Sequence, residues 1–190
     1  MYPLIRLITT ALQAKRQPAL AMFDTLTTSH RCMPWDIDPW GELNNGRTLT
    51  FYDLGRVSLG FRSGLTKIMR ANRWGLTIAG SVVRYRRRLL IMEKFTMQTR
   101  AIGWDDKFLY MEQSLWKKSG ECANHAVFRV AIVSEAGMVA PAKVAAEMGH
   151  VGPSPVLDEW VTKWIDAESA RPWPPMQDCH AAAQPQAAAE

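Results

Sequence analysis

The sequence is short of the residues that build metal centres and disulfide frameworks. It contains three cysteines and four histidines among 190 residues, and no two cysteines have the CxxC spacing. Three cysteines cannot all pair within one chain, so we expect reduced thiols and a cytoplasmic protein. Cys122 and His125 come nearest to a metal pattern but lack two further ligands, so we expect neither a metal site nor a cofactor.

Long apolar runs are also lacking. Near the N-terminus the apolar side chains fall at Leu4, Ile5, Ile8 and Leu12, and Arg6 interrupts them. This spacing predicts a short amphipathic helix within residues 1–18 that lies on a partner or, as the weaker alternative, on a membrane surface, without stable membrane insertion. No small-residue cleavage site follows convincingly, so a secretory signal is not expected.

The composition is that of an ordinary folded protein. The chain is 47% hydrophobic and 22% charged, and its length allows one domain with a substantial core and terminal extensions. We predict an N-terminal helix and linker at residues 1–22, the domain at 23–135, and a C-terminal helical extension at 136–170. The proline- and alanine-rich tail at 171–190 is typical of low-complexity sequence.

The order of periodic segments predicts an α+β protein. Leu54, Val57, Phe61 and Leu65 recur at helical spacing after Asn45. Extended segments are expected at residues 23–33, 76–90, 93–104, 107–117 and 121–133, which makes five antiparallel strands. One early strand, one long helix and then an uninterrupted meander place the helix across the concave face of the sheet, since nothing else can bury it.

A loop with several turn-forming residues lies between the first strand and the helix. Pro39 and Gly41 break the strand, and Asn44 or Asn45 can cap the helix with a side-chain oxygen. Asp38 therefore precedes a helix N-terminus, whose free N–H groups can polarise a substrate carbonyl. That is a candidate hydrolytic site, although an aspartate in a Pro-Gly loop is also a common turn or cap residue.

The pattern Asp-x-Asp-Pro-x-Gly-x-x-Asn-Asn before an amphipathic helix resembles the opening of hotdog-fold acyl-CoA thioesterases of the 4-hydroxybenzoyl-CoA thioesterase type. The runs 44–47, 53–57, 84–89 and 103–106 look like the thioesterase superfamily member six branch, in order and spacing. The resemblance covers residues 24–133. It implies a hotdog fold, a five-stranded antiparallel sheet wrapped around a long central helix with extra terminal helices, and hydrolysis of an acyl-CoA to a carboxylic acid and free CoA.

The resemblance also implies roles for individual residues. Asp38 matches the carboxylate that acts as general base or nucleophile, and the backbone N–H of Asn45 matches the donor that polarises the acyl oxygen. Gly75 matches a second backbone donor, although a turn glycine is equally expected there. Asp53 lies where another hotdog subgroup carries its acidic catalyst, and an ion pair with Arg56 is the alternative reading.

Substrate-binding roles are expected for Gly41 and Asn44 in the loop and for a basic cluster. With a formal net charge of +5, the chain gathers Arg84, Arg86, Arg87 and Arg88. Such a cluster could hold the phosphates of coenzyme A. A generic basic strand end and a nucleic-acid surface are the alternatives, but no binding module for nucleic acid accompanies the arginines, so no nucleic-acid partner is expected.

Two departures from the family pattern leave a second function open. Glu42 stands where family members often have histidine, and Thr48 where they often have an aromatic residue. A non-catalytic acyl or acyl-CoA binding protein of the same fold is therefore the alternative to the enzyme. Hotdog sites are built at subunit interfaces in the family, so self-association as a dimer or tetramer is implied.

Overall fold

A computed structural model describes residues 4–179 of the chain. The chain divides into two compact units, Met1–Val156 and Leu157–Glu190. The first unit holds the sheet and its helices, and the second holds α5 (Glu159–Ser169). Among the described residues, no helix is both long and apolar enough to cross a membrane. Residues 180–190 of the predicted tail lie outside the described residues, and the predicted domain bounds stay a prediction.

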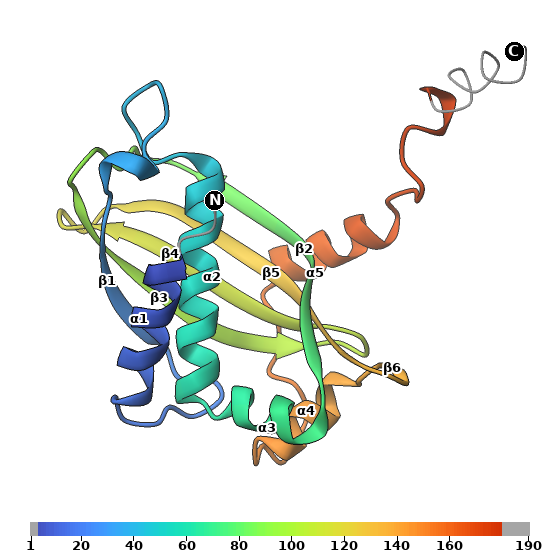
Figure 1. Cartoon of the computed structure of the whole chain (residues 1–190). Helices are drawn as coiled ribbons and strands as arrows, with labels where there is room; N and C mark the ends of the chain where they lie inside the picture. Colours follow the sequence, from blue (N-terminus) through green and yellow to red (C-terminus); the bar gives the residue numbers. More distant parts are fainter. Residues whose placement is uncertain (1–3, 180–190) are drawn as a thin grey trace, which may run out of the picture. The chain divides into compact units, whose positions relative to one another are not determined.

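The first unit is built on one curled antiparallel sheet (Figure 1). Its strands are β1 (Leu26–Arg31), β2 (Gly75–Tyr85), β3 (Lys94–Trp104), β4 (Leu109–Lys117) and β5 (Cys122–Ser134). The five strands lie in the order β1-β3-β4-β5-β2, and the short β6 (Gly137–Met138) pairs with β5. Burial alternates along the first half of β3, which is the pattern of an antiparallel strand with one covered face.

The predicted uninterrupted meander is wrong in one respect. The strand that follows the helix, β2, pairs with β5 at one edge of the sheet and not with β3, its successor in the chain. The connection at residues 86–93 therefore crosses from the β2 edge toward β3. Its start is held to β5, because the N–H groups of Arg86 and Arg87 both donate to the carbonyl of Ala123. The basic cluster thus lies mostly on this crossing, beyond the end of β2.

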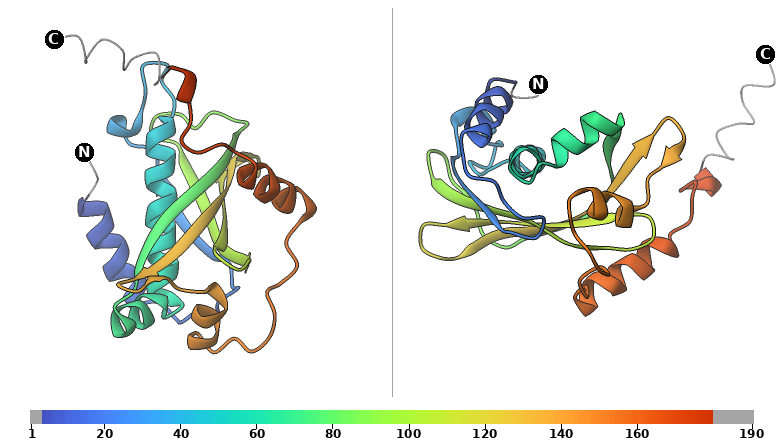
Figure 2. Two further views of the ribbon diagram at one scale, coloured as in Figure 1. Left: turned by 90° about the vertical axis from the view of Figure 1, so that its right-hand side faces the viewer. Right: turned by 90° about the horizontal axis from the view of Figure 1, so that it is seen from below.

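The long helix α2 (Asn45–Arg62) lies against the concave face of the sheet, as Figure 2 shows in two further views. It packs closest at Gly55. A Cβ atom there would lie 2.6 Å from Thr99 Oγ1, 2.7 Å from Gln113 Nε2 and 2.7 Å from the terminal methyl of Met97. All three side chains come from the sheet and are buried. Glycine is needed at this position because any side chain would push the helix away from the sheet.

Three further helices complete the first unit. α1 (Leu4–Lys15) packs beside α2, α3 (Leu65–Asn72) follows α2 directly, and α4 (Pro141–Glu147) follows β6. Gly64 separates α2 from α3 in a left-handed conformation with φ 80°, which glycine adopts without strain. The predicted N-terminal helix is present from Leu4, and its first three residues lie outside the described residues.

The contact at Gly55 gives a prediction for stability. We expect Gly55→Ala to lower the free energy of unfolding by about 2 kcal/mol, because overpacking of a buried contact exceeds the gain in helix propensity of up to about 1 kcal/mol. Gly60→Ala is the matched control on the same helix. A Cβ there meets only Thr66 Oγ1 at 3.1 Å. Urea denaturation of both variants measures the difference, and equal stability of the two would contradict the assigned contact.

Candidate active site

The N-terminus of α2 presents a free backbone donor. Asn44 is the N-cap, and its side-chain oxygen accepts hydrogen bonds from the N–H groups of Gly46 at 2.8 Å and Arg47 at 3.3 Å. The capping role predicted for Asn44 is therefore confirmed. Among residues 4–179, the N–H of Asn45 has no such partner. It can donate to a ligand at the positive end of the helix dipole.

The loop before α2 is closed at its base and projects beyond the end of the sheet (Figure 1). Ile37 bridges to Leu43 at the base. At the tip, Asp38 Oδ1 accepts hydrogen bonds from the N–H of Trp40 at 2.9 Å and of Glu42 at 3.3 Å. Asp38 is half-buried and shapes its own turn, and its second carboxylate oxygen has no partner among the described residues.

Asp36 anchors this loop to the N-terminal helix. Its carboxylate is 1% exposed and accepts two hydrogen bonds from the guanidinium of Arg6, at 2.9 and 2.8 Å. It also accepts from the N–H of Met33, and its own carbonyl accepts from the N–H of Asn44. Nearby, burial and then the charge of Arg6 lower the pKa of His30 to about 4. Asp36 is fully used in holding the loop, so it is not a candidate catalyst.

A polar pocket of about 190 Å³ lies at the start of α2. Asn45 and Thr48 of the helix, Tyr85 of β2 and Asn124 of β5 line it, together with Glu42, Leu43, Arg86, Arg87, Arg88 and Leu89. Asp38 and Gly41 do not line it. The carboxylate that reaches the pocket within one chain is Glu42, which forms an ion pair with Arg88.

The four clustered arginines differ in their partners. All are exposed. Arg87 forms an ion pair with Glu121 at 2.9 Å, and Arg88 pairs with Glu42. Among the described residues, the side chains of Arg84 and Arg86 form no ion pair. Of these two, Arg86 lines the polar pocket and Arg84 does not, so Arg86 is the better phosphate-binding candidate at that pocket.

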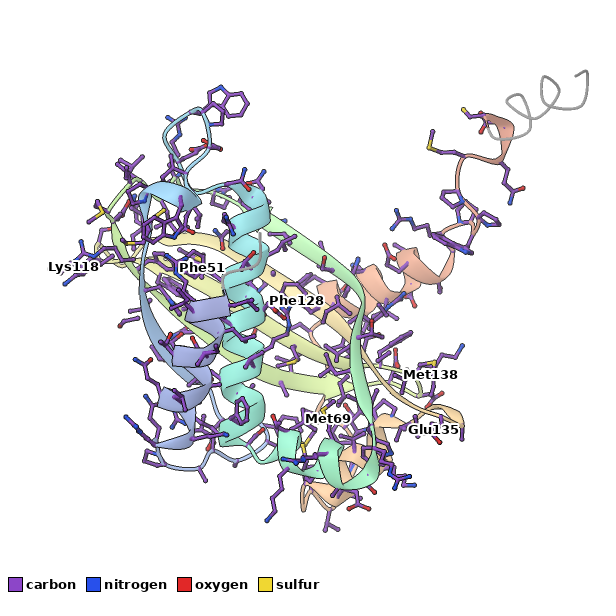
Figure 3. The ribbon with its side chains drawn as sticks, in the orientation of Figure 1. Phe51, Met69, Lys118, Phe128, Glu135 and Met138 are labelled. Carbon is purple, nitrogen blue, oxygen red and sulfur yellow. The ribbon has the colours of Figure 1, made fainter. Side chains whose placement is uncertain are left out.

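Asp53 lies in a different place, on the wall of a large apolar cavity. This cavity has a volume of about 690 Å³ and lies between α1, α2, α3 and the sheet. Val57, Phe61, Leu65, Met69, Trp74 and Leu76 are among the apolar residues that line it, and Figure 3 labels Met69 on α3. Asp53 contacts Arg56 at 3.3 Å, as the alternative reading of the sequence expected.

Gly75 is not brought to Asn45 within one chain. It is the first residue of β2, whereas Tyr85, which lines the pocket at Asn45, is the last. A strand of this length spans about 30 Å. The predicted second backbone donor therefore lies at the wrong end of β2 to act on a group bound at Asn45 of the same chain.

The structure adds polar residues that the sequence analysis missed. Gln113 is 1% exposed, donates to the carbonyl of Tyr52 at 2.8 Å and accepts from Arg56 at 2.8 Å. The side chain of the same tyrosine makes a second link to the sheet, because the Tyr52 hydroxyl donates a hydrogen bond to Asn124 Oδ1. Asn124 shares the inward-facing register of the buried Ala126 and Phe128 on β5. A polar residue at such a core-facing position was the signal that could have identified it.

Comparison with known proteins assigns the family. The model of the Thioesterase-like superfamily matches residues 32–167. The chain belongs to this superfamily. The match includes the loop with Asp38, the whole of α2, every strand from β2 to β6, and the arginines, so the resemblance seen in the sequence is confirmed.

Individual relatives agree with this membership. The chain is 36% identical to "Protein THEM6" of Xenopus laevis over 103 residues, which are 54% of this chain and 50% of that protein. It is 37% identical to "Protein THEM6" of Drosophila melanogaster over 91 residues, 47% of each. The chain thus spans about half the length of the curated relatives it matches.

Solved structures confirm the hotdog fold. The probable thioesterase YbaW from Escherichia coli superposes with a TM-score of 0.61 at 16% identity, covering 65% of this chain and 96% of that one. The protein SAV2348 from Staphylococcus aureus, crystallised in complex with CoA, superposes with a TM-score of 0.59 at 17% identity over 76% of this chain and 96% of its own.

Proposed function

We propose that this protein hydrolyses the thioester bond of an acyl-CoA. The observation that carries the proposal is the unpaired N–H of Asn45, which stands at a helix N-terminus in a polar pocket that is also lined by Arg86, an arginine without an ion pair among the described residues. Membership of the Thioesterase-like superfamily supports the reaction class. The activity, the substrate and the site residues are part of the proposal, as is the cytoplasmic location predicted from the cysteines.

The reaction needs a carboxylate and an oxyanion donor. The thioester carbonyl oxygen accepts the Asn45 N–H, which stabilises the negative charge that develops on this oxygen. Asp38 takes a proton from the attacking water, or it attacks the carbonyl carbon itself and forms a mixed anhydride that water then hydrolyses to the carboxylic acid. In either route the C–S bond breaks, and its electron pair leaves with the sulfur of coenzyme A. Asp38 must approach the pocket for this, because its carboxylate faces its own turn in the single chain.

The two cavities suit the two parts of such a substrate. Both lie beside α2 and β2, with Tyr85 of β2 at the polar one and Leu76 at the apolar one. The apolar cavity, about 690 Å³ in volume, is large enough for an acyl group. Arg86, which forms no ion pair among the described residues, lines the polar pocket, where the phosphates of coenzyme A would make charge-assisted contacts.

Self-association through β2 completes the proposal. β2 is an edge strand of 11 residues, and most of it is exposed. Leu76 is 40% exposed, Ile78 37% and Tyr85 44%. A long exposed edge with apolar side chains is a template for pairing with another strand. We propose that a second copy of the chain pairs there, antiparallel, beside the pocket that Tyr85 lines.

A specific observation keeps the non-catalytic alternative in view. Asp38 does not line the polar pocket, and the carboxylate that does, Glu42, is neutralised by Arg88. A protein that binds acyl-CoA without hydrolysing it would have the same fold, cavities and arginines. The two functions differ in whether any carboxylate near the pocket is required for thiol release.

Substitution of the carboxylates separates these functions. We expect Asp38→Asn to lower the rate of thiol release from acyl-CoA thioesters by about 100-fold or more, as for loss of a general base. The variant keeps Oδ1 as an acceptor for Trp40 and Glu42, so its turn is preserved. Glu42→Gln and Asp53→Asn serve as matched controls and should retain most of the activity, measured on short, long and aromatic esters.

The outcomes of this assay are distinct. Loss of activity only in Asp38→Asn supports the proposed catalyst. Loss only in Asp53→Asn moves the carboxylate to the apolar cavity. If the wild type binds acyl-CoA but hydrolyses none of the esters, the non-catalytic alternative is established and the proposed hydrolysis is excluded.

The arginines give a second test. We expect Arg86→Ala to raise KM for acyl-CoA by about tenfold, because a charge-assisted hydrogen bond to phosphate is worth about 1.5 kcal/mol or more before solvent screening. Arg87→Ala is the control, since Glu121 already holds that side chain. The effect should shrink as salt is added. An equal or larger rise in KM for Arg87→Ala would contradict the assignment.

The β2 edge gives a third test. We expect the wild type to sediment as a species of at least twice its chain mass of 21.4 kDa. Ile78→Lys should shift it to the monomer, because a lysine on a strand edge opposes pairing. Ile91→Lys is the control, since Ile91 is 52% exposed but lies outside β2. A monomeric wild type at assay concentrations would refute the proposed pairing.

A further inference from the structure

A side-chain amide reaches the pocket at the start of α2 from the opposite wall. Asn124 of β5 lines the pocket together with Asn45 and Thr48, and it lies opposite Tyr85 in the register of β5 and β2. Asn124 is only 4% exposed. A buried amide carries an acceptor oxygen and an NH2 group with two donors, and both ends need partners.

Tyr52 satisfies the oxygen of this amide and thereby orients it. The Tyr52 side chain is 0% exposed, and its hydroxyl donates to Asn124 Oδ1. Burial raises the pKa of the Tyr52 hydroxyl far above its ordinary value, so the proton stays on the tyrosine. Phe128 packs against the Tyr52 ring with centroids 5.5 Å apart, which holds the ring in place. Figure 3 labels Phe128 beside α2.

The NH2 end of Asn124 has no hydrogen-bond partner within residues 4–179. The same pocket holds the unpaired N–H of Asn45. Two donors without partners, one from the helix and one from the sheet, therefore meet in a space of about 190 Å³. Preorganised donors of this kind stabilise an oxygen atom that gains negative charge.

We propose that the Asn124 amide is the second donor to the thioester oxygen, acting with the Asn45 N–H, and that Tyr52 is its positioning residue. The inference rests on the proposed thioesterase function. As the attacking oxygen bonds to the carbonyl carbon, the carbonyl electron pair moves onto oxygen, and both N–H groups stabilise it. When this pair returns, the C–S bond breaks and coenzyme A leaves. Asn124 thus takes the role that the family pattern suggested for Gly75.

Three variants test the donor. Asn124→Asp keeps an oxygen for Tyr52 and removes the NH2, so kcat should fall by about 100-fold at neutral pH. Tyr52→Phe leaves the donor unanchored and should lower kcat by about tenfold, roughly the effect of one hydrogen bond. Tyr52→Phe/Asn124→Leu removes both polar groups together. It should fold with a urea midpoint near that of the wild type while losing as much kcat as Asn124→Asp.

KM and the pH dependence of kcat report on how the Asn124 donor acts. KM should change little in all three variants, because the donor acts mainly in the transition state. For Asn124→Asp, the ratio of its kcat to that of the wild type should rise as pH falls, since a protonated carboxyl regains an O–H donor. A smaller folded fraction of an otherwise normal enzyme would also leave KM unchanged, but it would not give this rise of the kcat ratio at low pH, so the pH profile is the readout that separates catalysis from structure. A double variant that folds and keeps the kcat of the wild type overturns the proposal.

An infrared measurement tests the Asn124 donor without requiring that the protein hydrolyse a substrate. The probe is a ketone analogue of acyl-CoA, in which CH2 replaces the thioester sulfur. Its carbonyl band should lie at lower frequency on the wild type than on Tyr52→Phe/Asn124→Leu. If the wild type hydrolyses no ester but this shift is present, the Asn124 amide is supported as a donor to the acyl oxygen and the proposed hydrolysis is refuted. If ester hydrolysis depends on Asp38 but the band is the same in both proteins, the role of Asn124 is refuted and the enzyme stands.

Discussion

The close contact of α2 with the sheet at Gly55 is the constraint on which both cavities depend. The helix approaches Thr99, Gln113 and Met97 so closely that no side chain fits between them. The Gln113 amide then donates to the helix carbonyl of Tyr52, so the contact is polar as well as tight. A helix of 18 residues is a rigid rod about 27 Å long. Fixing its middle therefore fixes where both of its ends meet the sheet.

The two ends of α2 offer opposite environments. At the first turn, the unpaired N–H of Asn45 and nearby arginines favour negative charge. In the second half, Val57, Gly60 and Phe61 line an apolar cavity. Between them, Tyr52 and Arg56 pack their side chains around Phe128, with the Arg56 guanidinium 4.2 Å from the ring centroid. A substrate with an ionic head and an apolar chain matches this division along a single helix.

Local patterns were predictable from the sequence, and long-range pairing was not. The strands, the helix and the cap at Asn44 follow from turn residues and periodicity, which act over a few positions. The neighbour of β2 does not, because the position of an edge strand depends on how the whole sheet closes. The same limit hid the link between Arg6 and Asp36, which are 30 residues apart, and that between Tyr52 and Asn124, which are 72 apart.

The residues of the candidate site show the same difference between local patterns, which the sequence reveals, and long-range contacts, which it does not. Asn45 was predictable because its donor belongs to a helix start, which the sequence marks locally. Gly75 lies at the other end of β2 from the pocket at Asn45 of the same chain, which the sequence could not show because the position of a strand start relative to α2 depends on the path of the entire chain. Its role as a donor stays a prediction. The arginines were found as a group. Which of them form ion pairs depends on Glu121 and Glu42, which reach them from the turn between β4 and β5 and from the loop before α2.

The loop with Asp38 is held at its base and projects at its tip, and this difference bears on catalysis. Arg6 and Asp36 fix the first residues, and the bridge from Ile37 to Leu43 closes the base. The cap at Asn44, and with it the free N–H of Asn45, therefore stays in place whatever the tip does. Among the described residues, the hydrogen bonds and ion pairs that join the turn carrying Asp38 to other segments run through this base and through Glu42. In the proposed reaction, a movement of the turn would thus bring the carboxylate to the thioester without disturbing the donors proposed to polarise it.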